Sequence, residues 1–271
     1  HGLYPAFLTC FRCSPDAYLL NYVKDIFNHY HKPHLILQID EHTSDVGYQT
    51  RLEAAIDTFR DDFARKRDRR GVSQAPLPPR TPKNDPISPG DTVLIPYVSP
   101  IISHLQSIAF IANGNPSHVV PLDQKMINRG YHYASGGECM PNAALLGSLI
   151  EFVESEGLDP ATTVYYLPNL CMSCNFNQYS MMIETALEKA GLGDLKIYNA
   201  NILTKMEGVP KKLNLNFLEA GIIGSLLYKL AFRFAPYEKH SGETRQLLAE
   251  GVDLVEQHMR DIGVVPDRVR G

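Results

Sequence analysis

The chain has 271 residues, of which 44% are hydrophobic and 21% are charged, with a formal net charge of −4 at pH 7. These values are typical of a globular protein with one large domain or two packed ones. The slightly acidic balance gives no reason to expect a nucleic-acid partner. Five cysteines in a chain of this length argue against a secreted disulfide scaffold, so we expect a cytoplasmic protein with reduced or metal-bound cysteines.

No secretory signal or uninterrupted membrane span is visible in the sequence. The most apolar stretch, 217–234, contains Glu219, Lys229 and Arg233, so we expect a buried core helix there and no contact with a membrane. The chain begins with His1 and not with Met, which suggests a piece of a longer protein.

The first part of the chain, 1–66, alternates short apolar runs with helical periodicity. The following stretch, 67–91, is basic and then proline-rich, which is typical of a linker or a surface loop. The basic residues could bind a phosphate-bearing partner, but a solvated surface is the simpler interpretation. The elements expected in the first part are strands at 3–10 and 34–40 and helices at 15–30 and 48–66.

The alternation resumes in a second unit, 92–212, and two helices follow in 213–271. Strands that alternate with helices predict a mostly parallel sheet covered by helices. We therefore expect an α/β protein with two doubly wound, Rossmann-like units and a helical C-terminus. The expected elements are strands at 92–98, 118–122, 162–168 and 195–202 and helices at 101–112, 141–156, 176–191, 214–234 and 241–262.

All the cysteines, at positions 10, 13, 139, 171 and 174, lie near predicted junctions where a helix begins. A helix N-terminus carries unpaired N–H groups and partial positive charge, which favour a thiolate and can donate to the sulfides of an anionic cluster. Thiolates gathered there could hold an iron–sulfur cluster or zinc. Buried structural cysteines or a thiol–disulfide pair remain open alternatives.

Several polar residues share these edges, where α/β proteins bind ligands. Glu41 and His42 could act as catalytic acid and base, with a structural role equally open. Glu138 could position the loop of Cys139. Structural roles in capping or ion pairs are favoured for Asp45, Arg51 and Glu53, and a surface role for His29, His31 and His34.

Four segments resemble one family: "CSPDAYLLNYV", "LILQIDEHTSDVGYQTRLEAAIDTF", "GGECMPNAALLGSLIE" and "LPNLCMSCNFNQYS". Their order and spacing over roughly residues 1–200 are similar to those of the acyl-CoA dehydratase activases. They are also similar to the iron–sulfur subunits of 2-hydroxyacyl-CoA dehydratases and benzoyl-CoA-reductase-like enzymes. The long segment around "IDEH" is the most specific of the four.

The resemblance implies an iron–sulfur component of a dehydratase (lyase) or reductase of anaerobic metabolism. Cys13, Cys139 and Cys174 would hold a [4Fe-4S] cluster or part of a larger one, while Cys10 and Cys171 could add a ligand, replace one or hold nothing. An ATP-dependent activator would deliver low-potential electrons for radical reduction or dehydration of an acyl-CoA or similar substrate. A homo- or hetero-oligomer is expected.

The chain departs from the family at two points. Asn175 and Asn177 stand where the family usually has Arg and Gly, and no glycine-rich phosphate loop is present. The chain should therefore not hydrolyse ATP by itself. The alternative is a non-catalytic assembly or regulatory module of the same fold that binds zinc or no metal.

Overall fold

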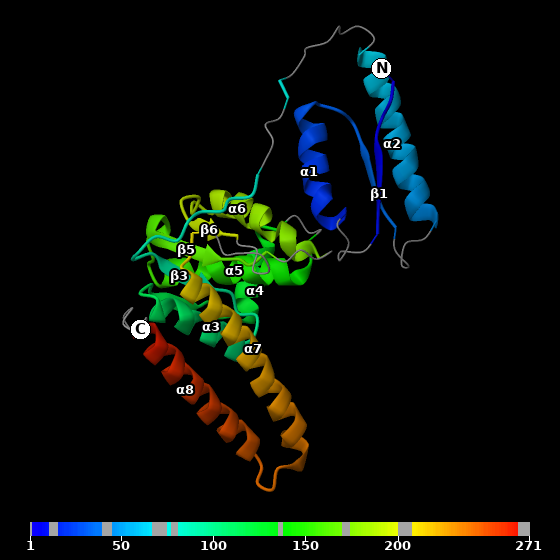
Figure 1. Ribbon diagram of the computed structural model, residues 1–271. Coiled ribbons are helices and arrows are strands. Elements are labelled where there is room, and N and C mark those ends of the chain that lie inside the picture. Colours follow the sequence, from blue (N-terminus) through cyan, green and yellow to red (C-terminus); the bar gives the residue numbers. More distant parts are fainter. Residues whose placement is uncertain are drawn as a thin grey trace.

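The chain forms an α/β structure with two separate parallel sheets (Figure 1). A computed structural model describes residues 2–10, 16–39, 45–66, 75–76, 81–134, 138–169, 174–199 and 208–264. The smaller sheet pairs β1 with β2, and the larger has the strand order β4-β3-β5-β6. All strand pairs are parallel, which confirms the expected fold class.

The smaller sheet consists of β1 (Ala6–Thr9) and β2 (Leu35–Gln38), flanked by α1 (Asp16–His29) and α2 (Asp45–Lys66) (Figure 1). The predicted apolar face of α2 is only partly covered, and the side chains of Ile56 and Phe63 are exposed. Two strands offer too little surface to bury a long helix on each side. This region is therefore smaller than the Rossmann-like unit expected from the sequence.

The larger sheet follows the predicted order of elements, with one helix that the sequence did not predict. That helix is α4, which begins after Asp123, whose carboxylate accepts a hydrogen bond from the backbone N–H of Met126 at 2.7 Å. In chain order, the elements of this part, α4 included, are β3 (Thr92–Ile95), α3 (Pro100–Ala112), β4 (Ser117–Val119), α4 (Gln124–Tyr131), α5 (Met140–Ser155), η1 (Pro160–Thr162), β5 (Thr163–Tyr166), η2 (Asn175–Gln178), α6 (Tyr179–Lys189) and β6 (Lys196–Tyr198).

Helices cover both faces of the larger sheet, and successive buried side chains along each strand point alternately to the two faces. Val93 and Ile95 of β3 pack in the cluster formed with α3 and the C-terminal helices, whereas Leu94 packs in the cluster formed with α5 and α6. The same alternation separates Tyr166 from Tyr165 on β5. Strands buried on both faces explain the continuous apolar runs in the sequence.

α4 and α5 pack with their backbones in close contact. A Cβ atom on Gly130 would lie 1.8 Å from the carbonyl oxygen of Ala143, and one on Gly147 would lie 1.9 Å from that of Met126. Ion pairs from Arg129 to two glutamates of α5 add to this contact. Because α5 begins directly after Cys139, this packing also holds the cysteine in place.

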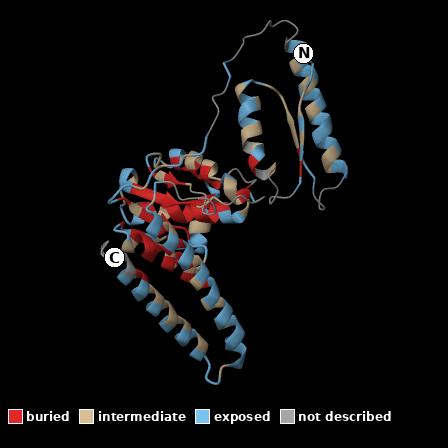
Figure 2. Cartoon of the chain, viewed as in Figure 1, coloured by how far each residue is buried: buried red, intermediate tan, exposed pale blue. Residues whose placement is uncertain are grey.

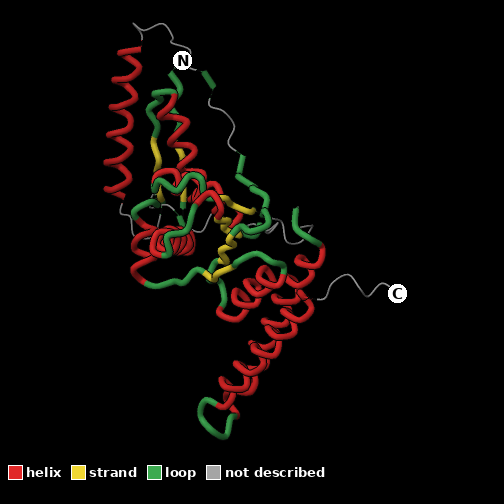
Figure 3. The backbone as a smooth tube through the Cα atoms, turned by 90° about the vertical axis from the view of Figure 1, so that its left-hand side faces the viewer, coloured by secondary structure: helices red, strands yellow, loops and turns green. Residues whose placement is uncertain are grey.

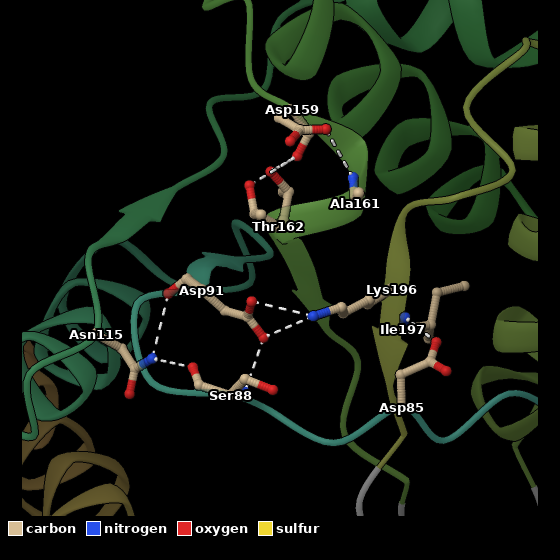
Figure 4. A network of polar contacts seen from close by, with 10 residues as sticks. Asp85, Ser88, Asp91, Asn115, Asp159, Ala161, Thr162, Lys196 and Ile197 are labelled. Atoms are coloured by element: carbon tan, nitrogen blue, oxygen red, sulfur yellow. Dashed lines mark hydrogen bonds and ion pairs between the residues drawn. The ribbon is translucent and has the colours of Figure 1, made fainter.

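A polar network closes the opposite, N-terminal side of the larger sheet (Figure 4). Lys196 of β6 contacts both carboxylate oxygens of Asp91 at 3.0 Å, and only 4% of Asp91 is exposed. Asn115 donates to the carbonyl oxygens of Ser88 and Asp91. These bonds tie β6, the start of β3 and the α3–β4 turn together.

The C-terminal helices α7 (Lys211–Phe234) and α8 (Glu243–Val264), joined through η3 (Ala235–Tyr237), form a hairpin that projects from the larger sheet (Figures 1 and 3). Phe217 and Met259 are buried where the hairpin meets α3. The far half is exposed or half-buried (Figure 2). The expectation of a buried core helix at 217–234 is therefore wrong for its outer face, since no element within the described ranges covers it.

Among the described residues, Lys211–Tyr237 is the single helical stretch whose length and composition would allow it to cross a membrane. Core helices of soluble proteins pass the same test.

Candidate functional site

The candidate site lies where loops leave the carboxyl ends of the larger sheet. β3 leads through α3 to β4 on one side, whereas β5 leads through α6 to β6 on the other. The chain thus proceeds outward from β3 toward one edge of the sheet and outward from β5 toward the other edge. In parallel sheets, this change in the direction of the connections leaves a crevice between the two strands, here β3 and β5. Cys174 lies on the loop that follows β5 and directly precedes η2.

Cys139 is the best-defined member of the site. It occupies the position before α5, with extended backbone and no hydrogen bond from its side chain to the first turn of the helix. Its Sγ instead lies 2.8 Å from the hydroxyl of Tyr179 and 3.3 Å from the hydroxyl of Tyr18. The thiol is thus held between two aromatic hydroxyls and beside the N-terminus of a helix.

The two tyrosines come from different parts of the chain. Tyr18 belongs to α1, beside the smaller sheet, and Tyr179 begins α6 of the larger sheet. Their rings stack at 5.8 Å between centroids, and Phe176 packs edge-on against Tyr179 at 5.0 Å. Cys139 therefore lies at a junction between the two sheet regions.

Burial dominates the electrostatics of this junction. Only 1% of Tyr18 and 3% of Tyr179 is exposed. Burial, reinforced by the contact with Cys139, raises the pKa of both hydroxyls well above the ordinary value for tyrosine. Both groups are consequently neutral O–H donors at physiological pH, and they can donate to the sulfur whenever it is a thiolate.

Cys174 belongs to the same stretch of chain as Tyr179, because it directly precedes η2, which leads into α6. Its side chain is exposed, whereas Cys139 is half-buried. Glu138, the residue before Cys139, is 4% exposed. Cys139 thus contacts Tyr179, and Cys174 lies five positions before Tyr179 in the chain.

The other predicted site residues are distributed as follows. Cys10 is exposed just after β1. Asp45 is the first residue of α2, where a negative charge suits the helix dipole. Glu53 accepts a hydrogen bond from Gln49 one turn earlier, and Arg51 is exposed on the same helix. The predictions for Cys13, Cys171, Glu41 and His42 lie outside the described residues.

The three histidines at the end of α1 do not act together. His29 bonds the carbonyl oxygen of Ala75 at 3.0 Å, and His34 bonds that of Lys32 at 3.2 Å. These backbone contacts agree with the surface role expected from the sequence.

Within the described ranges, no three His, Cys, Asp or Glu side chains lie together in a way that could hold a metal ion. The thiols of Cys139 and Cys174 both precede helical turns. Thiols and neutral hydroxyl donors are groups that could hold an anionic iron–sulfur cluster.

A scan against models of protein families, a search of curated proteins and a search of solved structures each found no match to this chain. The resemblance described above therefore rests on the sequence motifs alone.

Sequence reasoning found the cysteines but missed their partners. Tyr18 lies in the segment "CSPDAYLLNYV" and Tyr179 in the segment "LPNLCMSCNFNQYS", but the sequence alone assigned no role to either. Aromatic residues at fixed distances after motif cysteines were the available signal.

Proposed function

We propose that the chain is an iron–sulfur protein of the kind implied by its motifs. It would be a component of a dehydratase or reductase system that receives electrons from an ATP-dependent activator and acts on an acyl-CoA or similar substrate. One observation carries the proposal: Cys139 lies at the start of α5 between two buried tyrosine hydroxyls, and one of these tyrosines, Tyr179, follows the short helix that Cys174 precedes. Tyr18, one of these tyrosines, follows Cys13 closely in the sequence.

Cys13, Cys139 and Cys174 would hold the cluster, and Cys10 or Cys171 could add a ligand. A bound cluster would supply one-electron redox chemistry. Tyr18 and Tyr179 would donate to the Cys139 sulfur, fix its direction and keep water from it. Glu41 and His42 are proposed as acid and base.

The proposal includes a finer fold, in which each sheet region belongs to a doubly wound, Rossmann-like unit. The boundaries are those expected from the sequence, with units at 1–66 and 92–212, a linker at 67–91 and C-terminal helices from 213 onward. A cytoplasmic location suits free thiols and a reduced cluster.

The test is the metal content of anaerobically purified protein. We expect about four iron atoms with matching sulfide per chain and a visible absorption band that bleaches with dithionite. Cys13→Ala, Cys139→Ala and Cys174→Ala should each abolish cluster binding. Tyr166→Phe is the matched control, because it removes a buried tyrosine hydroxyl from the core cluster on the other face of the sheet from Cys139 and should retain iron. Full iron and sulfide in all three cysteine variants would refute the assignment.

A non-catalytic assembly or regulatory module of the same fold, with zinc or with no metal, is the alternative. It is favoured by Asn175 and Asn177, which stand where the family usually has Arg and Gly, and by the lack of a glycine-rich phosphate loop in the sequence. Stoichiometric zinc, or no metal, together with no response to dithionite would support this alternative. Turnover of a hydroxyacyl-CoA in the presence of an activator would exclude it.

A further inference from the structure

Large apolar side chains are exposed in the far half of the C-terminal hairpin, Phe232 and Tyr237 among them, and five others lie on one side of it. These five are Leu226, Leu230 and Phe234 on α7 and Leu247 and Leu254 on α8, with exposed fractions between 44% and 68%. Single exposed apolar residues are ordinary, but a contiguous patch of this kind marks an interaction site. We call these five residues the hairpin face.

The hairpin face lies on one side of the two helices. Leu230, Phe234 and Leu247 line a shared groove of about 220 Å³ between α7 and α8. Leu226 lies one turn before Leu230, and Leu254 lies two turns after Leu247, so helical spacing places both on the same side. The face therefore spans both helices.

Charges of opposite sign border the hairpin face. Lys229 follows Leu226 by three positions, which places it at the edge of α7. Glu250 lies three positions after Leu247 and four before Leu254, which places it at the edge of α8. Both side chains are exposed. One edge is thus basic and the other acidic.

These two charges lie at nearly the same height along the hairpin. A Cβ atom on Gly251 would lie 3.3 Å from Cδ2 of Leu227, so these residues face each other across the two helices. The two helices run antiparallel, so moving two residues forward from Leu227 to Lys229 corresponds to moving two residues back from Gly251 to position 249. Glu250 is one residue from that position, so its level along the helix axis differs from that of Lys229 by about 1.5 Å, the rise of one residue.

We infer that the hairpin face binds the hairpin face of a second copy of this chain, forming an antiparallel four-helix bundle. A two-fold axis parallel to the helices sets α7 of one copy against α8 of the other. This rotation does not shift any residue along the helix axis, so residues at the same level in one hairpin meet at the same level in the dimer. Lys229 of each copy then meets Glu250 of the other, and Arg233 approaches Glu243. The surface is self-complementary, as a two-fold interface requires.

The charge pattern favours a second copy over a lipid surface. An anionic membrane would attract the basic edge of α7 but repel the acidic edge of α8. A partner that carries both signs in the reversed order satisfies both edges, and a copy rotated about the axis does so at the two pairs named above.

The test is the molar mass of the full chain by light scattering and sedimentation equilibrium. We expect a dimer at concentrations of tens of micromolar. Lys229→Glu and Glu250→Lys should each raise the dimer dissociation constant by about tenfold or more, because each puts like charges together at two symmetric sites. The double variant should restore the dimer. Lys239→Glu, the same charge change in the loop outside the face, should leave the dimer intact.

Leu230→Glu should also give a monomer, with an unchanged circular dichroism spectrum that excludes unfolding as the cause. A monomeric wild-type chain throughout the concentration range would overturn the inference. So would a double variant that remains as weak as the single variants. Binding of a monomeric chain to vesicles containing anionic lipid would assign the face to a membrane instead.

Discussion

Replacing Gly147 with alanine should break the contact between α4 and α5. A Cβ atom on this residue would lie 1.9 Å from the carbonyl oxygen of Met126 and 2.4 Å from the backbone nitrogen of Gly130. Because these are backbone atoms, they cannot rotate away as a flexible side chain would, and α4 must move as a whole. Overpacking costs about 1–3 kcal/mol and occasionally more, and this contact belongs at the upper end.

The gain in helix propensity offsets part of that cost. Alanine is favoured over glycine by about 1 kcal/mol inside a helix. We therefore expect a net loss of about 2 kcal/mol in the free energy of unfolding, which corresponds to a decrease of about 4–8 °C in the melting temperature. Thermal and urea unfolding followed by circular dichroism would measure both quantities.

Gly221→Ala in α7 is the matched control, because a Cβ atom there would meet nothing within 4 Å. This variant should gain about 0.5–1 kcal/mol from the lower entropy of the unfolded chain. Opposite signs for the two substitutions are the expected result. An equal gain in stability in both variants would show that α4 does not pack against α5 through these glycines.

Two further predictions concern buried polar groups. In the Lys196→Met variant, the nearly buried carboxylate of Asp91 keeps its hydrogen bond from the backbone N–H of Ser88 but loses its cation. The free energy of unfolding measured with urea should therefore fall by about 2 kcal/mol. The control Lys239→Met, in an exposed loop, should change this free energy by less than about 0.5 kcal/mol. Burial raises the pKa of the hydroxyls of Tyr18, Tyr165, Tyr166 and Tyr179, whereas the unfolded chain titrates near about 10. Their folded-state pKa is the higher one, so their stabilisation is present below about pH 10 and is lost as pH rises further. Of the 14 tyrosines, these four should contribute the part of the tyrosinate absorbance that rises together with the loss of circular dichroism. Ionisation of all 14 near about pH 10 with native circular dichroism would contradict this.

Local patterns were sufficient to predict most elements of the fold. Alternating buried strands and amphipathic helices were read correctly within a few residues, as for α5, expected at 141–156 and found at Met140–Ser155. The helix α4 was missed because Gly130 interrupts its pattern, although Asp123 is a typical capping residue. Glycine serves there for close helix packing, which depends on the partner helix and not on the local sequence.

The sequence by itself determined the α/β class, the strand order along the chain and the placement of cysteines before helical turns, since these depend on periodicity and capping over a few residues. Only the tertiary structure decided that Tyr18 of α1 and Tyr179 of α6 converge on Cys139, because 121 positions separate Tyr18 from this cysteine. It also decided that the outer face of α7 is exposed. Apolar periodicity shows that a helix has a face to bury, whereas what covers the face depends on the packing of distant elements.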